Sequence, residues 1–204
     1  PYSPYRIESD RLTARCWSPE DAEAFRALLD RNNDHLRPFI PWMADEPRSL
    51  EQTRERLRKD SLRFTDNDDY RYALLDRGGI LIGEMILSTR SGGNSREVGY
   101  LLDKETIGRG LATEAAAMLI KAAFVHCKVD HVDLHCSPRN TASIRIAEKL
   151  GFKLLKIEEK SMTDSEGLVD DSMHWRLGSG DFPGSLAAGI DIRAFDGHGN
   201  QLQD

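Results

Sequence analysis

Two glycines flank an arginine in the stretch ETIGRGLATEA, just before an alanine-rich run with helical spacing. Glycine at a helix start costs roughly 0.5–1 kcal/mol of backbone entropy relative to alanine, so its use there calls for a reason. The first N–H groups of a helix lack partners and carry a partial positive charge, so they bind phosphate readily. Bare glycines would let phosphate oxygens reach them. The predicted anion cradle consists of Gly108, Arg109, Gly110, Leu111, Ala112 and Thr113.

The glycine stretch matches neither of two common phosphate-binding motifs. It lacks the GK[ST] ending of a P-loop, and Thr113 stands where the dinucleotide-binding fingerprint has its third glycine. A tight turn between a strand and a helix explains the same residues equally well. The choice between a cradle and a turn therefore depends on the rest of the chain.

The elements around this stretch alternate between period-2 and helical patterns. Ser18, followed by Pro19, and Ser49 are predicted N-caps, and Gly151 is predicted to end a helix. The first predicted helix follows Ser18 and continues to residue 29. The other predicted helices cover residues 49–64, about 111–126 and 140–150. The predicted strands cover residues 11–17, 70–76, 80–88, 96–103, 131–136, 152–160 and 168–177.

Composition indicates one soluble globular domain without a membrane span. The chain has 204 residues, of which 39% are hydrophobic and 30% charged. Its net charge of −6 argues against a nucleic-acid binder. Three cysteines without CxxC spacing, Cys16, Cys127 and Cys136, favour reduced thiols and a cytoplasmic location. We expect the domain to cover residues 1–177 and residues 178–204 to form an appendage that is at least partly flexible.

The order of motifs resembles the GCN5-related N-acetyltransferase (GNAT) family, whose pyrophosphate loop reads [Q/R]xxGx[G/A]. Ile107, Gly110 and Ala112 fill these positions, and the apolar Ile107 is similar to the RimJ/RimL branch. Further stretches resemble that branch: ESDRLTARCWSPEDAEAF, HLRPFIPWM, EVGYLL, NTAS and KLGF. The resemblance covers about residues 5 to 177.

This resemblance implies an α/β (α+β) fold with a mixed, largely antiparallel sheet. The sheet would splay between the strand ending at Leu101 and Leu102 and the strand 131–136, and acetyl-CoA would enter there. Its pyrophosphate would lie on residues 108–113, and its pantetheine arm beside Leu101 and Leu102. Asn140 would contact the pantetheine, or serve only as a helix N-cap.

Acetyl transfer needs a deprotonated amine and a stabilised thiolate. Glu97 matches the acidic residue of the family's ExGY pattern and is the candidate base, acting through water; otherwise it is an exposed charge that attracts a cationic substrate. Ala147 stands where many family members have a tyrosine that protonates the thiolate. Ser143 matches the serine that the RimL branch places near the sulfur, and its hydroxyl can donate a hydrogen bond to it.

The resemblance implies an acceptor site lined by His35, Phe39 and Trp42, with Glu97, although the aromatic residues also fit an ordinary core. We expect a protein N-terminal α-amine of ribosomal type as acceptor. The alternatives are a small amine, such as a polyamine, amino acid or antibiotic, and a CoA-binding sensor without turnover. We expect a monomer or homodimer. The histidines other than His35, including His131 and His135, look structural. No metal is predicted, because four residues of strand separate His131 from His135 by ~13 Å, too far for one ion.

Overall fold

The computed structural model describes residues 2–203, and one nine-stranded sheet forms the centre of that range. The strands lie in the order β7-β8-β6-β5-β4-β3-β2-β1-β9. Their bounds are β1 Arg6–Glu8, β2 Leu12–Cys16, β3 Tyr70–Asp76, β4 Leu81–Ser88, β5 Ser95–Leu102, β6 His131–Cys136, β7 Lys153–Thr163, β8 Val169–Gly178 and β9 Arg193–Phe195. The predicted α/β fold with a mixed, largely antiparallel sheet is confirmed.

Local sequence explains where the helices begin and end. Ser18 and Ser49 form capping boxes, and the Asn140 side chain accepts a hydrogen bond from the backbone N–H of Ser143. Gly151 follows α5 with a φ of 81°. The bounds are η1 Pro19–Asp21, α1 Ala22–Arg31, α2 Asn33–Leu36, η2 Pro41–Asp45, α3 Leu50–Thr65, η3 Lys104–Thr106, α4 Leu111–Val125, α5 Thr141–Lys149, η4 Phe182–Gly184 and α6 Leu186–Gly189.

The sheet divides between β5 and β6. These two strands are parallel and pair only over residues 95–97 and 131–133. Beyond those pairs, β5 continues beside β4 and β6 continues beside β8. Residues 98–102 and 134–136 therefore face each other across a gap in the sheet, which is the separation that the sequence predicts.

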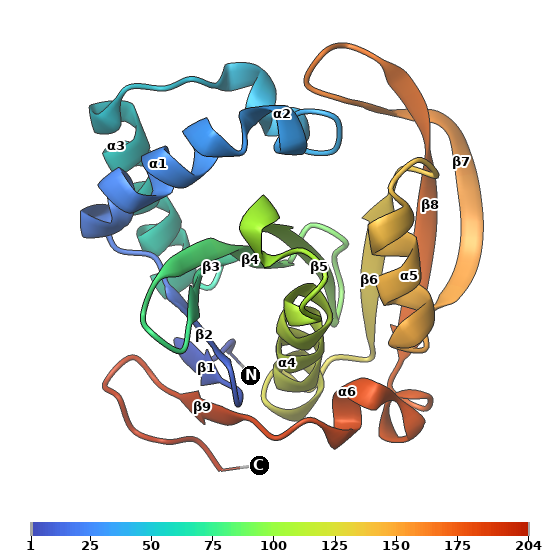
Figure 1. Cartoon of the computed structure of the whole chain (residues 1–204). Helices are drawn as coiled ribbons and strands as arrows, with labels where there is room; N and C mark the ends of the chain where they lie inside the picture. The colour runs from blue at the N-terminus through green and yellow to red at the C-terminus, as the bar shows by residue number, and fades with distance from the viewer. Residues whose placement is uncertain (1, 204) are drawn as a thin grey trace.

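Helices cover both faces of the sheet and bury two separate cores (Figure 1). α4 lies on one face, where its alanines and its larger apolar residues are buried nearly all round. α1 and α3 lie on the other face, over β3 and β4. α4 is also the crossover that the parallel strands β5 and β6 require.

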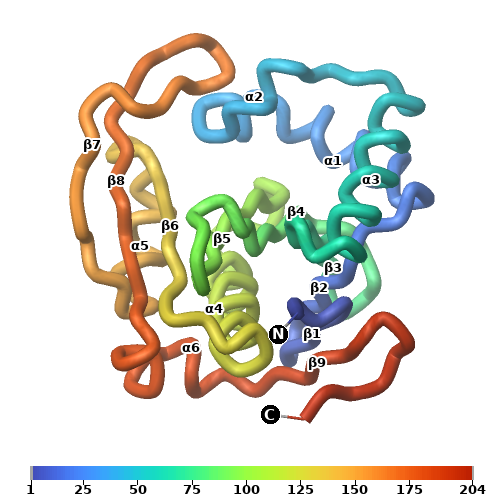
Figure 2. The backbone as a smooth tube through the Cα atoms, turned by 180° about the vertical axis from the view of Figure 1, so that it is seen from behind, coloured from blue at the N-terminus to red at the C-terminus, as the bar shows by residue number. Residues whose placement is uncertain are grey.

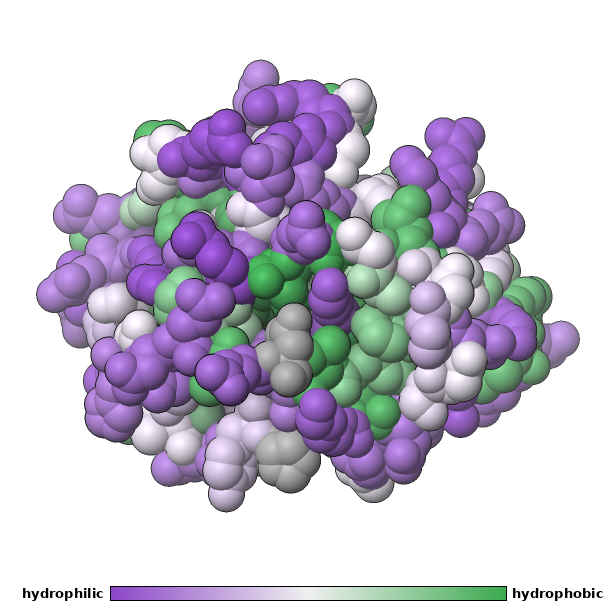
Figure 3. Space-filling view, turned by 90° about the horizontal axis from the view of Figure 1, so that it is seen from below, coloured by the Kyte–Doolittle hydropathy of each residue, from purple (hydrophilic) through white to green (hydrophobic). Residues whose placement is uncertain are grey.

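The segment after residue 177, which the composition predicts to be a partly flexible appendage, forms regular elements in the structure. It passes beneath α4 and ends beside β1 (Figure 2). The Phe182 ring stacks on Phe124 of α4 at 4.4 Å between centroids, and Lys121 Nζ donates to the Ile190 carbonyl at 2.6 Å. Seen from below, hydrophobic residues gather near the centre of this side of the molecule, among hydrophilic ones (Figure 3).

A buried carboxylate ties α1 to the end of β5. Asp103 accepts hydrogen bonds from Arg31 Nε at 2.8 Å and Asn32 Nδ2 at 3.2 Å, and Asn32 Oδ1 accepts from the Lys104 N–H at 2.9 Å. Burial opposes ionisation of Asp103. The hydrogen bonds from Arg31, the Glu105 backbone and Asn32 together outweigh it and hold the pKa of this carboxyl below its usual value.

Asp103→Ala should lower the free energy of unfolding by about 2–3 kcal/mol at pH 7, because it removes charge-assisted hydrogen bonds from Arg31 and takes one acceptor from the buried Asn32 amide. Since the folded-state pKa is depressed, this stabilisation is complete above about pH 3.9 and is lost as the pH falls through the folded-state pKa. Urea denaturation across pH measures both effects. The exposed Asp10, which pairs with Arg77, is the control: Asp10→Ala should change stability by less than about 1 kcal/mol. Equal stability of the two variants would contradict the role of Asp103.

Candidate functional site

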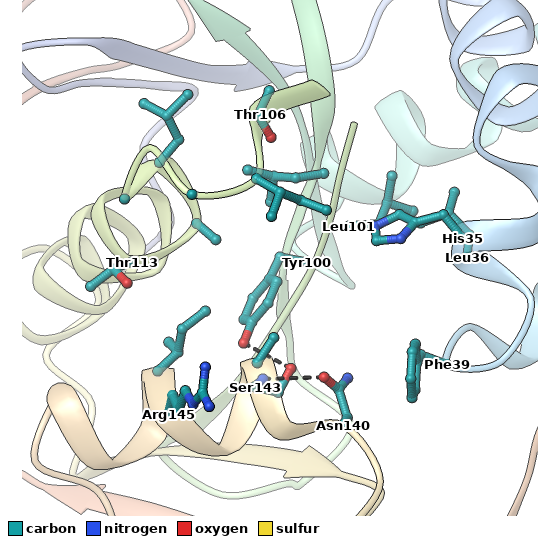
Figure 4. A pocket seen from close by; sticks show the side chains of 18 of the residues that line it. His35, Leu36, Phe39, Tyr100, Leu101, Thr106, Thr113, Asn140, Ser143 and Arg145 are labelled. Carbon is teal, nitrogen blue, oxygen red and sulfur yellow. Dashed lines mark hydrogen bonds between the residues drawn. The ribbon is translucent and has the colours of Figure 1, made fainter. Parts of the chain in front are cut away.

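A pocket of about 520 Å³ lies beside the gap in the sheet. Its walls are α2, the turn before α4, the end of β5 and the first turns of α5 (Figure 4). The structure brings together most of the predicted site residues here: His35, Phe39, Leu101, Leu102, Gly108, Gly110, Leu111, Ala112, Thr113, Asn140 and Ser143.

The glycine turn before α4 opens onto this pocket. Gly108 and Gly110 have φ values of 80° and 72°, a left-handed conformation that other residues resist. A Cβ at Gly108 would meet nothing within 4 Å, and one at Gly110 only the Arg11 guanidinium at 3.7 Å. The backbone angles therefore require the glycines, while the space above them stays open. Gly110 is the N-cap of α4 and offers no side chain to its first N–H groups.

The cationic side chains at the pocket differ from the prediction. Arg109 is not among the residues that line it; its carbonyl accepts from Arg11 Nη1 at 2.9 Å, and Arg11 also pairs with Glu114. Arg145 and Lys149 of α5 do line the pocket, and the sequence reasoning did not single them out. Their i, i+4 spacing on the helix capped by Asn140 is the signal that could have identified them.

A buried pair of hydroxyl groups lies between β5 and α5. Tyr100 donates to Ser143 Oγ at 3.0 Å (Figure 4). Burial raises the pKa of Tyr100 to about 12, so the phenol stays protonated and remains a donor. The Ser143 hydroxyl proton is then free to point into the pocket. The motif comparison points to a tyrosine only at the position of Ala147, whereas alternation along EVGYLL places Tyr100 on the same strand face as Leu102.

The acceptor-side aromatic residues divide between two places. His35 and Phe39, two of the residues predicted for the acceptor site, line the pocket from the segment around α2. Trp42 does not line it: the η2 turn directs this indole to the core beneath α1 and α3, where the Arg56 guanidinium lies 4.3 Å from its ring centroid. The prediction that Trp42 lines the acceptor side is therefore not met by this structure.

Glu97 lies at the edge of the gap and on the other sheet face from Tyr100. It is the last residue of β5 paired with β6, opposite Asp133. Its carboxylate pairs with both Nε and Nη2 of Arg90, and His135 Nδ1 lies 3.5 Å from Glu97 Oε1. Glu97 does not line the pocket described above, so its predicted place beside the thioester would require approach from the opposite face.

Two further observations concern the described part of the chain, residues 2–203. No group of three or more His, Cys, Asp or Glu side chains is placed there to hold a metal ion. None of the helices in that range is long and apolar enough to cross a membrane.

Comparison with known proteins gives consistent matches. Residues 11–153 match the family described as acetyltransferase (GNAT) domain. The chain is 30% identical over 148 residues to "Probable N-acetyltransferase YjcK" of Bacillus subtilis (strain 168), covering 70% of this chain and 80% of that protein. It is 30% identical over 171 residues to "Putative ribosomal N-acetyltransferase YdaF" of the same organism, covering 83% and 89%. The structure of Mycobacterium smegmatis RimJ in complex with CoA-disulfide superposes with a TM-score of 0.79 at 19% identity, covering 91% and 90%.

Proposed function

The chain belongs to the GNAT acetyltransferase family, and we propose that it moves the acetyl group of acetyl-CoA onto the N-terminal α-amine of a ribosomal protein. The main support for this proposal is the shape of the pocket. A single pocket joins an open helix N-terminus to a serine hydroxyl beside a gap in the sheet. The gap provides a backbone edge for an extended arm, and the helix N-terminus provides a place for its phosphates.

The residues present fit acetyl-CoA along this path. We assign the pyrophosphate to the N–H groups of residues 108–113, with Arg145 and Lys149 supplying positive charge from the facing helix. The pantetheine arm would pair with the free edge of residues 98–102, as an added strand does. The thioester would then lie close to Ser143, and a backbone N–H near Leu101 would stabilise its carbonyl oxygen as negative charge develops.

Ser143 is proposed to stabilise the departing thiolate through a hydrogen bond, and Tyr100 to hold Ser143 in that orientation. Because Tyr100 donates to Ser143 Oγ, the serine has its own proton left for the sulfur. The high pKa of Tyr100 keeps this donor intact at neutral pH. Asn140 caps α5 by accepting from the Ser143 backbone, which fixes the start of the helix that carries the hydroxyl.

The acceptor is proposed to reach the thioester between α2 and the β7–β8 hairpin. His35 and Phe39 line the pocket from the α2 side, and the tip of the hairpin bends toward α2 (Figures 1 and 2). There Ser165 Oγ donates to the Arg37 carbonyl at 2.7 Å. An α-amine suits such a site, because its pKa of about 7.7–8.0 makes the neutral form cost only ~1 kcal/mol at pH 7, against ~4–5 for lysine.

Gly110→Asp should weaken acetyl-CoA binding at least tenfold relative to Gly110→Asn, as measured by isothermal titration. Both side chains tolerate the left-handed conformation and are nearly equal in size. They differ in charge, and the aspartate would occupy the helix N-terminus and repel the pyrophosphate. Equal affinities of the two variants for acetyl-CoA would contradict the assignment of the pyrophosphate to residues 108–113.

Ser143→Ala should lower kcat roughly tenfold to a hundredfold with little change in acetyl-CoA affinity, because it removes a donor to developing negative charge. Tyr100→Phe should lower kcat less. In the Ser143→Ala background, Tyr100→Phe should cause no further loss, because Tyr100 acts through Ser143. Thiol release measures all three variants. Additive losses would show that the two hydroxyls act independently.

The acceptor itself is tested by a turnover screen with mass-spectrometric detection. Peptides with ribosomal-protein N-termini should be acetylated on the α-amine, and the same peptides with a blocked α-amine should not react at their lysines. Turnover of polyamines, amino acids or aminoglycosides alone would redirect the proposal to a small-amine acetyltransferase. Binding of acetyl-CoA without any turnover would identify a CoA-binding sensor.

A further inference from the structure

A cluster of titratable side chains lies on the sheet face opposite α4, where β5 and β6 part. His135 of β6 lies 3.5 Å from Glu97 of β5, measured from Nδ1 to Oε1. Its ring also lies against that of His174 on β8, with 4.0 Å between the centroids. His174 Nε2 in turn lies 3.0 Å from Glu158 Oε2 on β7. Four strands, β5, β6, β7 and β8, therefore contribute one connected chain of proton-binding groups.

The position of His135 relates this cluster to the gap. The last β5–β6 pair is Glu97 with Asp133, and two residues farther along each strand stand Gly99 and His135. Alternation along each strand places both on the same face as that pair. The His135 side chain retains 22% of its exposure. His135 thus lies on β6 two residues beyond the last β5–β6 pair, where the two strands have parted.

Glu97 already forms an ion pair with Arg90. Its carboxylate is nearly buried and pairs with two nitrogens of Arg90. Such bidentate pairing holds the carboxylate in place and offsets part of its charge. Nδ1 is the His135 nitrogen that lies 3.5 Å from Glu97 Oε1, so we assign the opposite nitrogen, Nε2, to the substrate. The arrangement follows the logic of a carboxylate that orients an imidazole base.

We propose that His135 is the catalytic base that takes the proton from the acceptor's ammonium group, and that Glu97 is the residue that positions it. The inference rests on the proposed acetyl transfer and adds the proton acceptor to it. It also revises the sequence-based prediction, in which Glu97 was the base and His135 was structural.

One ammonium N–H bond breaks, and its proton binds His135 Nε2, which leaves a lone pair on the amine. That pair forms a bond to the thioester carbon, and the carbonyl pair moves to oxygen. The oxygen pair then re-forms the C=O bond as the C–S bond breaks with its pair on sulfur. Of the two protons on the new amide nitrogen, one moves to the sulfur and one stays, and His135 releases its proton to solvent. The products are the N-acetyl amine, CoA thiol and one proton.

The surroundings of His135 keep its imidazole in the neutral, proton-accepting form at neutral pH. Burial lowers the pKa of His135 most strongly; Glu97 and Asp133 raise it, and His174 and Arg90 lower it, with a net decrease. These groups face the imidazole from β5, β6, β8 and the β4–β5 turn, and Glu158 of β7 reaches it through His174. Because the base works only when neutral, turnover should fall as the pH drops through this lowered pKa.

The first test compares His135→Gln with His131→Gln. His131 shares the strand and the face but lies at the far end of β6, so its variant should keep the wild-type rate and pH profile. His135→Gln should lose about a hundredfold in kcat at pH 7, with acetyl-CoA affinity and the amine KM within a few-fold. Its rate should rise with pH toward the pKa of the amine, about 8, without the lower-pH plateau of the wild type. His135→Asn, with folding checked by circular dichroism, repeats the test should the glutamine fit poorly.

The second test uses Glu97→Gln, which should shift the pH profile rather than abolish it. Removing the carboxylate removes a charge that favours imidazolium, so the acidic limb should move to lower pH. A purely structural effect would lower the rate without moving the limb. The proposal is overturned if His135→Gln keeps the wild-type rate and limb, or if Glu97→Gln alone abolishes the limb. A wild-type protein that binds acetyl-CoA but acetylates no amine would instead overturn the proposed function, and His135's role with it.

Discussion

The constraint on which the structure depends is the short pairing between β5 and β6. Three parallel pairs hold the two strands together, and then β4 draws one away while β8 draws the other. A parallel pair needs a crossover connection, and here that connection is α4, packed between the strands and the C-terminal segment. The same helix therefore connects the two strands that part, and the turn at its N-terminus lines the pocket beside the gap. The proposed phosphate site and the gap in the sheet thus lie on one strand–helix–strand unit.

The gap also divides the proposed chemistry between two faces of one sheet. On the α4 and α5 side, Tyr100 and Ser143 form a hydroxyl pair in an apolar pocket, which suits a departing thiolate. On the other side, Glu97, His135 and His174 form a charged and titratable cluster, which suits a cationic amine. Alternation along β5 directs successive side chains to opposite faces, so one short strand supplies both groups.

Short-range signals predicted much of this fold. The caps at Ser18, Ser49 and Asn140 are confirmed, because each depends only on residues two or three positions away. The strands at residues 70–102 and the final hairpin also follow the predicted pattern. The segment after residue 177 was predicted only as an appendage, from its shift to a glycine-rich composition, although Ile190, Ile192 and Ala194 alternate with polar residues along the stretch that contains β9. Its order comes from long-range contacts such as Phe182 with Phe124 and β9 with β1.

By itself, the sequence determined the glycine turn, the helix that follows it and the motif order that resembles an acetyltransferase. Those properties are local, because backbone angles and capping depend on neighbouring residues. The tertiary structure decided which side chains meet: Tyr100 with Ser143, Glu97 with Arg90 and His135, and Trp42 with Arg56 rather than the pocket. Such meetings depend on strand register and on the angle at which helices cross the sheet. Neither the register nor the crossing angle can be inferred from the spacing of residues along the chain.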